Sequence, residues 1–279
     1  NDANSSDECT AVAVWCTDRP RPALQLSDGM DEVRAMLRSS FRADLEVRTK
    51  SDASPVTETD LRVEEFLRER ILEHYPEHGF QGEETSAAEG TTDWVWVVDP
   101  IDGTRSFASG RPLFTSLLAL VEDGTPRLGV IEAPMTGERW IAHSQGASLF
   151  NGNPLGVRSP RSLAEAVVIV SRPGSWVGPH AEFLDRLQAA CHWLFFEHDA
   201  YGYGQLARGD VDLVVERELK MVDVAAVAPI VQAAGGVIET WGGKSVELKG
   251  EGDLNAVSVI AGSCTELLEE VRALGLAAG

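Results

Sequence analysis

Two aspartates three residues apart, at the end of an apolar run, are the residues of this chain best suited to chemistry. Residues 94–98 read as a buried strand, and residues 99–104 follow with the sequence Asp-Pro-Ile-Asp-Gly-Thr. Paired carboxylates bind hard cations such as Mg²⁺, which prefer oxygen ligands. Gly103 lets a backbone amide approach a ligand, and Thr104 places a hydroxyl where a short helix could begin. The segment predicts a metal and phosphate site; the alternative is an ordinary turn after a buried strand.

Upstream of this segment, the pattern predicts helices and a turn-rich connection. Apolar residues at helical spacing indicate a helix over residues 31–41, and a second helix is expected to follow a cap at Thr59 and Asp60. A polar loop is expected between them, over residues 50–57. The turn-rich segment 78–84 ends in a pair of glutamates shortly before the strand that carries the aspartates.

Downstream, the pattern changes from an antiparallel meander to alternating strands and helices. The meander is expected to have strands over residues 117–121, 127–131, 139–142 and 147–149. The later alternation favours a layered α/β second half. Its expected strands are 166–170, 193–196, 211–215, 236–239 and 256–260, and its expected helices are 181–190, 201–207, 224–234 and 264–274.

A cluster of Asn, Gly, Pro and Arg near residues 153–161 is the expected boundary between two lobes. We expect a poorly defined N-terminal arm over residues 1–27, with one short strand at 12–15. An α+β lobe with an antiparallel sheet is expected over residues 28–155, and an α/β lobe over residues 156–279.

The composition indicates an ordinary folded protein with an acidic surface. The chain has 279 residues and is 43% hydrophobic, which is enough for a substantial core. Its 44 acidic and 24 basic residues give a net charge of −20, which argues against nucleic acid or an anionic membrane surface as a partner. No apolar run has the length of a transmembrane helix and no secretory signal is recognisable, so a cytoplasmic protein is expected.

The cysteines and histidines do not indicate a metal site of the zinc type. Cys9, Cys16, Cys191 and Cys264 form no CxxC pair, so reduced thiols are expected, with a Cys9–Cys16 bridge as the alternative for an exported protein. The six histidines show neither HxH nor HExxH spacing. An anionic substrate would therefore depend on cations held by carboxylates.

Three motifs resemble, in order and spacing, the signatures of the inositol monophosphatase superfamily. They are Gly82-Glu83-Glu84, the hexapeptide at 99–104, and Val222-Asp223-Val224-Ala225-Ala226 followed by Ala234-Gly235-Gly236. The resemblance implies an α/β fold with an α+β first lobe, arranged as an αβαβα layered sandwich with the active site between the lobes. It also implies a Mg²⁺-dependent phosphomonoesterase that acts on a small phosphorylated metabolite and forms a homodimer.

The resemblance also implies how the acids would hold two or three Mg²⁺ ions per site. Glu83, Asp99 and the backbone carbonyl of Ile101 would hold the first ion. Asp99, Asp102 and Asp223 would hold the second, so the second lobe would supply the last ligand. Taken alone, Asp223 is also typical of a helix N-cap.

Catalytic and phosphate-binding roles follow from the same resemblance. Glu83 and Thr104 would orient and deprotonate the attacking water. Asp102, together with the amides of Gly103 and Thr104, would contact the phosphate.

Within the superfamily, this chain is most similar to the histidinol-phosphatase branch. The similar segments are residues 50–57, 105–112, 137–140 and 211–216, together with Pro229, which should kink the helix after Asp223. Glu216 matches the position that contacts the organic part of the substrate, and Asp199 is expected to contact a polar group of the substrate. This pair suits the cationic amine of histidinol phosphate, and it suits hydroxyl groups equally well. Inositol, sugar or nucleotide phosphates are therefore alternative substrates, and a catalytically silent regulatory or scaffold homologue is the non-enzyme alternative.

Several residues near the motifs have two interpretations. Glu84 is expected to face solvent or to lie outside the ligand set, and Asp60 to be either a helix cap or an outer partner of Glu83. Arg105 and Arg111 would meet phosphate or line the surface, and the surface is favoured for Arg111. Val222 and residues 171–176 depart from the family pattern, and both departures are expected to affect the substrate pocket.

Overall fold

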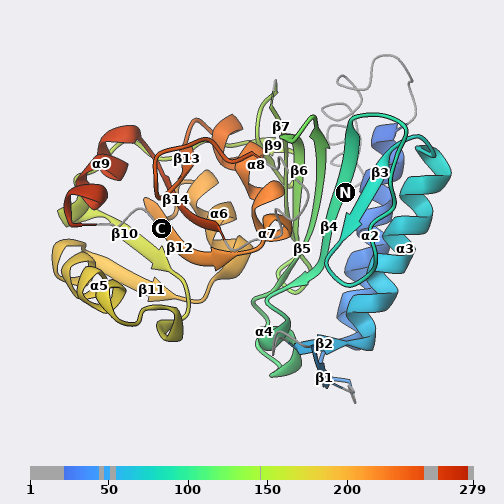
Figure 1. Cartoon of the computed structure of the whole chain (residues 1–279), viewed down its shortest axis with the longest axis horizontal. Coiled ribbons are helices and arrows are strands. Elements are labelled where there is room, and N and C mark those ends of the chain that lie inside the picture. The colour runs from blue at the N-terminus through green and yellow to red at the C-terminus, as the bar shows by residue number, and fades with distance from the viewer. Residues whose placement is uncertain (1–21, 44–46, 51–54, 145, 248–256, 276–279) are drawn as a thin grey trace.

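The computed structural model of this chain has five layers, in the order helix, sheet, helix, sheet, helix (Figure 1). It describes residues 22–43, 47–50, 55–144, 146–247 and 257–275. One outer layer contains α2 (Pro22–Ser40) and α3 (Glu58–His74), the middle layer contains α6 (Asp199–Ala207), α7 (Met221–Ala225) and α8 (Val227–Ala233), and the other outer layer contains α5 (Pro179–Ala190) and α9 (Thr265–Ala273). This arrangement confirms the predicted layered α/β fold.

The first sheet has seven strands in the order β3-β4-β5-β6-β7-β8-β9. They are β3 (Gly79–Gly82), β4 (Trp94–Asp102), β5 (Thr115–Glu122), β6 (Thr125–Ala133), β7 (Glu138–His143), β8 (Leu149–Phe150) and β9 (Asn153–Pro154). The predicted antiparallel meander corresponds to β5–β8. The antiparallel pairing extends further, to β4 on one side and to β9 on the other, and β3 pairs parallel to β4 at the edge. The β5–β6 hairpin turns at Asp123 and Gly124, whose φ angles of 45° and 73° are those of a tight hairpin turn.

The second sheet has five strands in the order β11-β10-β12-β14-β13. They are β10 (Val167–Val170), β11 (Trp193–Phe196), β12 (Leu213–Leu219), β13 (Val237–Thr240) and β14 (Val257–Gly262). β10 pairs parallel to β11 and β12, whereas β14 pairs antiparallel to β12 and β13. β10 and the adjoining end of β12 are apolar throughout because both faces of the sheet are covered by helices.

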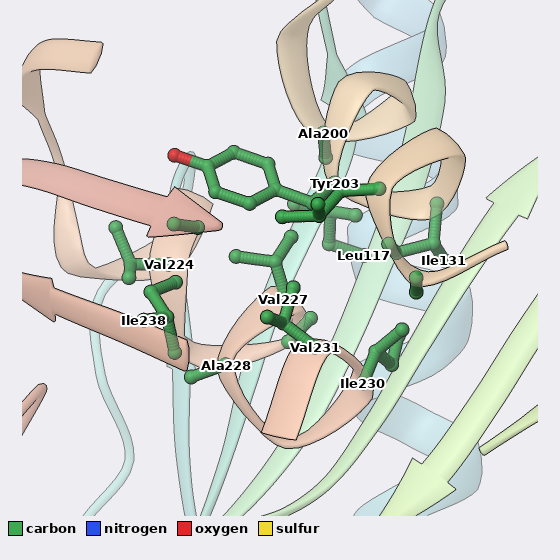
Figure 2. Packing of buried hydrophobic residues seen from close by; sticks show 14 of the residues in the cluster. Leu117, Ile131, Ala200, Tyr203, Val224, Val227, Ala228, Ile230, Val231 and Ile238 are labelled. Atoms are coloured by element: carbon green, nitrogen blue, oxygen red, sulfur yellow. The ribbon is translucent and has the colours of Figure 1, made fainter. Parts of the chain in front are cut away.

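The central core lies between the two sheets and joins the part of the chain that forms the first sheet, here called the first lobe, to the part that forms the second sheet, here called the second lobe. Figure 2 shows Leu117 and Ile131 of the first sheet packed with Tyr203 of α6 and Val227 of α8. Gly129 allows β6 to lie close to the backbone at Ala226, because a Cβ atom at position 129 would lie 1.9 Å from the carbonyl oxygen of Ala226.

The predicted single helix over residues 224–234 is wrong, because the structure has two helices separated at Ala226. Pro229, in the first turn of α8, has no N–H to donate to the carbonyl of Ala225, which explains the interruption. This result agrees with the kink expected from Pro229.

The first helices also differ from the predicted ones. α2 begins at Pro22 rather than at Asp31, and proline is well tolerated in the first turn of a helix. The predicted cap is right for Asp60 and wrong for Thr59. Thr57 is the N-cap of α3, and its side chain accepts hydrogen bonds from the backbone N–H groups of Thr59 and Asp60. The Asp60 side chain completes a capping box by accepting from the N–H of Thr57.

The predicted loop over residues 50–57 contains a strand at its end. β2 (Pro55–Thr57) pairs antiparallel with β1 (Val47–Thr49). The expected strand at 12–15, as well as Cys9 and Cys16, lies outside the described residues. Cys191 and Cys264 are free thiols. Within the described part of the chain, no helix has the length and apolar character needed to cross a bilayer.

Candidate active site

A β-bulge at the end of β4 places the two aspartates of the hexapeptide. Asp99 pairs with Leu117 and Asp102 with Thr115, and the register shifts between these two pairs. The N–H of Ile101 donates to Asp99 Oδ1 at 3.0 Å, so the turn between the aspartates is held by one of their own carboxylates. Asp102 Oδ2 accepts hydrogen bonds from Thr115 Oγ1 at 3.1 Å and from the backbone N–H of Ala200 at 2.6 Å. β5 and α6 thereby fix the second carboxylate.

Gly103 and Thr104 continue the chain from β4 into the short helix α4 (Thr104–Ala108). Gly103 has a φ of 86°, and a Cβ atom at this position would lie 2.7 Å from Asp199 Oδ2. Both the backbone conformation and this close approach therefore require glycine. The hydroxyl of Thr104 donates to the carbonyl oxygen of Ile101 at 2.9 Å.

Asp223 reaches the two aspartates from the other lobe. It lies in the first turn of α7, where Oδ2 accepts a hydrogen bond from the backbone N–H of Lys220 at 2.7 Å. Asp99, Asp102 and Asp223 each offer one carboxylate oxygen, and these oxygens lie within 4.8 Å of one another. Asp223 thus stabilises the start of a helix and joins a three-carboxylate cluster.

The electrostatics of this cluster fit a bound cation. Burial, with repulsion from neighbouring carboxylates, raises the pKa values of Asp99 and Asp102 well above the ordinary range. Burial and the charge of Glu83 raise the pKa of Asp223 to about 7. Three crowded carboxylates form a set of hard oxygen donors, so the residues present suit Mg²⁺.

Glu83 lies beside this cluster, directly after β3, where its N–H donates to the carbonyl of Val98 at 3.1 Å. Its Oε1 atom accepts hydrogen bonds from Lys50 Nζ at 3.0 Å and Lys220 Nζ at 2.8 Å. Burial opposes ionisation of Glu83, but the two lysines outweigh it and lower the pKa of this carboxyl group. Glu83 is therefore charged at neutral pH.

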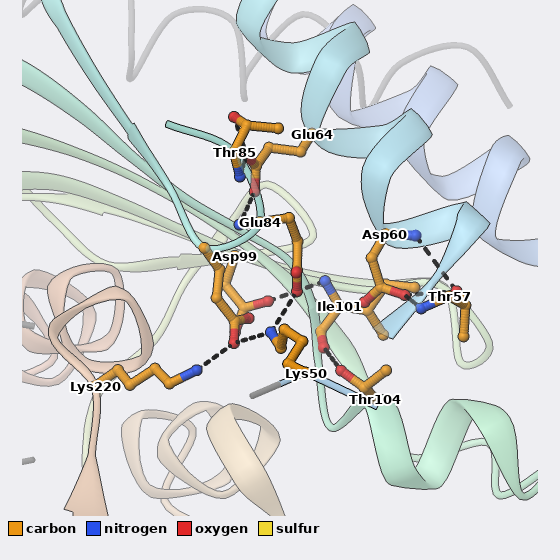
Figure 3. A network of polar contacts seen from close by, with 11 residues as sticks. Lys50, Thr57, Asp60, Glu64, Glu84, Thr85, Asp99, Ile101, Thr104 and Lys220 are labelled. Carbon is orange, nitrogen blue, oxygen red and sulfur yellow. Dashed lines mark hydrogen bonds and ion pairs between the residues drawn. The ribbon is translucent and has the colours of Figure 1, made fainter. Parts of the chain in front are cut away.

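Glu84 and Asp60 have their own partners. Glu84 does not face solvent: its side chain is 2% exposed and pairs with Lys50 Nζ at 2.8 Å, as Figure 3 shows. Asp60 is fully buried, and its Oδ2 accepts from the N–H and the hydroxyl of Thr57 at 2.8 and 2.5 Å. These bonds support the helix-cap interpretation of Asp60.

Glu64 of α3, whose role the sequence pattern did not indicate, supports the loop that carries Glu83. This buried carboxylate accepts hydrogen bonds from the N–H groups of Glu84 and Thr85, each at 2.8 Å, and from Thr85 Oγ1 at 2.5 Å (Figure 3). Its position four residues after Asp60, on the same helix face, was the available signal. Lys220 was also missed, because only the fold brings it to Glu83.

All nine residues selected from the sequence line one cavity of about 250 Å³ between the lobes. They are Glu83, Asp99, Ile101, Asp102, Gly103, Thr104, Asp199, Glu216 and Asp223. Burial raises the pKa of Asp199 to about 6 and that of Glu216 to about 8, and nearby carboxylates contribute to both shifts. The cavity therefore has a carboxylate cluster at one place and a second acidic pair close by.

The cavity also has basic residues at its rim. Arg105 and Arg111 both line it; Arg111 is exposed and pairs with Glu197 at 3.4 Å, so it lies at the surface as favoured. Of the two departures from the family pattern, the loop over residues 171–176 contributes lining residues to the cavity. Val222 instead lies in the central core, so its expected effect on the pocket is not borne out by its position.

The chain is similar to proteins named as phosphatases. It is 37% identical over 221 residues to the Arabidopsis thaliana bifunctional phosphatase IMPL2, covering 78% of this chain and 63% of that protein. It is 33% identical over 238 residues to a Chlorobaculum parvum histidinol-phosphatase, covering 84% and 92% of the two chains. A Mycobacterium tuberculosis histidinol-phosphatase is 36% identical over 230 residues, covering 79% of this chain and 86% of that protein.

Solved structures and a family model agree with these similarities. An inositol monophosphatase from Zymomonas mobilis has a TM-score of 0.78 and 35% sequence identity, with coverage of 90% of this chain and 95% of the other. The model of the inositol monophosphatase family matches residues 25–275. These findings confirm the predicted enzyme class, because the named relatives are phosphatases. This chain belongs to the inositol monophosphatase family.

Proposed function

We propose that this chain is a Mg²⁺-dependent phosphomonoesterase whose substrate is histidinol phosphate. The observation that carries the proposal is a single cavity lined by the Asp99, Asp102 and Asp223 cluster and by the neighbouring pair Asp199 and Glu216. The cluster suits cations that bind a phosphate ester. The pair suits the ammonium group of the substrate, because a nearby positive charge favours the ionised forms of both carboxyl groups.

The ligand sets proposed for two of the ions share Asp99. Asp99, Asp102 and Asp223 would hold one ion, and Glu83, Asp99 and the carbonyl of Ile101 another, with room in the proposal for a third. Bound Mg²⁺ supplies positive charge to phosphate oxygens and lowers the pKa of a bound water.

Glu83 and Thr104 act on the attacking water in this proposal. Thr104 gives its hydroxyl hydrogen to the carbonyl of Ile101, so its oxygen is able to accept a hydrogen bond from water. Glu83 is ionised at neutral pH and accepts the proton of that water. Asp102 and the backbone amides of Gly103 and Thr104 contact the phosphate in this proposal, because these three consecutive residues line the cavity.

A phosphate-release panel tests the substrate. Histidinol phosphate, inositol 1-phosphate, fructose 1,6-bisphosphate and a nucleoside monophosphate are compared at saturating Mg²⁺, and the highest kcat/KM is expected for histidinol phosphate. The similar proteins include ones named fructose-1,6-bisphosphatase/inositol-1-monophosphatase and inositol-1-monophosphatase, so a preference for another ester would assign the alternative substrate. No release from any ester would favour the regulatory or scaffold alternative.

The proposed setting is a cytoplasmic homodimer. Trp193 and Phe195 of the edge strand β11 are 58% and 45% exposed, and β11 carries no charged residue, so this strand offers an apolar surface to a second copy. Sedimentation at micromolar concentration is expected to give twice the chain mass, and a monomer there contradicts the dimer. Cell fractionation tests the compartment.

A further inference from the structure

Lys220 connects the two lobes at the candidate metal site. It directly precedes α7 in the second lobe, and its Nζ atom lies 2.8 Å from Oε1 of Glu83 in the first lobe. Its backbone N–H donates to Asp223 Oδ2 at 2.7 Å. One residue therefore contacts a proposed ligand of each ion.

The oxygen that Lys220 contacts already has another ammonium group. Lys50 Nζ lies 3.0 Å from the same Oε1 atom, and it also pairs with Glu84 Oε1 at 2.8 Å. A Mg²⁺ ion binds its oxygen ligands at roughly 2.0–2.1 Å and repels ammonium groups. Glu83 Oε1 therefore cannot bind an ion while both lysines keep their present positions.

Of the two lysines, Lys220 is better placed to move. The Lys50 side chain is 21% exposed. The Lys220 side chain is 34% exposed and lines the cavity where the phosphate is proposed to bind. Its flexible four-carbon side chain allows the ammonium group to move away from Glu83 while the backbone N–H of Lys220 keeps its hydrogen bond to Asp223.

We propose that the ammonium group of Lys220 neutralises Glu83 in the metal-free protein, moves away from this carboxylate when a metal ion binds there, and then contacts the phosphate of the substrate. The inference rests on the proposed function, since it assigns the displaced ammonium group to a phosphate in the same cavity. Lys220 is a positioning residue in the metal-free protein and a substrate-binding residue in the metal-loaded one.

The first test is a calorimetric Mg²⁺ titration at fixed pH and ionic strength. Lys220→Met is expected to bind Mg²⁺ about fivefold more tightly than the parent protein, because the competing charge is gone. Lys220→Arg keeps the charge and is expected to bind as the parent does, and exposed Lys244→Met serves as the control. If Lys220→Met fails to fold, Lys220→Gln takes its place. Unchanged or weaker Mg²⁺ binding overturns the proposal, because a purely structural lysine would loosen the site when removed.

The second test measures binding of inorganic phosphate at saturating Mg²⁺. Lys220→Met is expected to bind phosphate about fivefold more weakly, opposite in sign to its effect on Mg²⁺. Equal phosphate affinity in the two proteins refutes the second contact. Both titrations measure binding rather than turnover, so failure of the lysine proposal is distinct from failure of the substrate panel.

Discussion

Gly82→Ala tests how the protein positions Glu83. A Cβ atom at Gly82 would lie 2.0 Å from Oε1 and 2.2 Å from Cδ of Glu64. Because non-bonded atoms need about 3.4 Å or more, the buried carboxylate of Glu64 must move away by roughly 1.4 Å. It would then lose much of its hydrogen bonding to Glu84 and Thr85, at present 2.8, 2.8 and 2.5 Å.

The expected cost follows from these bonds. Hydrogen bonds to a charged group contribute about 1.5–3 kcal/mol each, so partial loss of three should lower the free energy of unfolding by about 2–4 kcal/mol. For a chain of this size the Tm should fall by roughly 5–15 °C. Displacement of Glu83, the next residue, should lower kcat by about 100-fold.

Differential scanning calorimetry and phosphate release at saturating Mg²⁺ measure the two effects. Gly29→Ala in α2 is the matched control, because outside the local helix backbone no atom lies within 4 Å of the added Cβ, and alanine favours a helix by about 1 kcal/mol. The reasoning is refuted if Gly82→Ala melts and turns over like the parent protein.

Three further predictions concern the carboxylates. Asp99→Asn should lower turnover by about 1,000-fold or more and remove most of the Tm increase caused by Mg²⁺, because one carboxylate binds both proposed ions. Asp185→Asn, at an exposed position, is the control and should change neither quantity. Near-normal turnover of Asp99→Asn would contradict the two-ion assignment. In the metal-free protein the pKa of Asp223 is raised from 3.8 to about 7, so the stability that this group contributes is present at low pH and is lost as pH rises towards 7. The rise in Tm that Mg²⁺ causes should therefore be larger at pH 8 than at pH 5.5. An equal rise in Tm at both pH values would contradict this role of Asp223. Glu216→Gln should raise KM for histidinol phosphate about tenfold with a smaller change in kcat, and a uniform loss across the substrate panel would instead indicate a structural role.

Local patterns predicted the parts of the fold and site that depend on local sequence. The apolar strand before Asp99 and the glycine turns of the meander are encoded by neighbouring residues, and the structure has both. Pro229 indicated an interruption that the structure places at Ala226. The choice of Thr57 rather than Thr59 as the cap depended on where β2 ends, which local propensity does not determine.

Long-range contacts account for what the sequence analysis missed. In the sequence, Glu64 is not distinguishable from other polar residues of its helix. Its hydrogen bonds to the loop after Glu83 depend on the close approach of Gly82, which only the fold shows. Lys220 lies 137 positions from Glu83 in sequence, and only the packing of the lobes joins them. Val222, a departure from the family motif, was expected to affect the pocket, but the direction of α7 places its side chain in the core.

The most direct test of the central claim, that this cavity hydrolyses phosphate esters with metal ions, is phosphate release measured in Mg²⁺ and in EDTA. The account predicts release from at least one small phosphomonoester in Mg²⁺, and loss of that release in EDTA that added Mg²⁺ restores. Release that continues unchanged in EDTA, or no release from any ester of the panel in Mg²⁺, would contradict it.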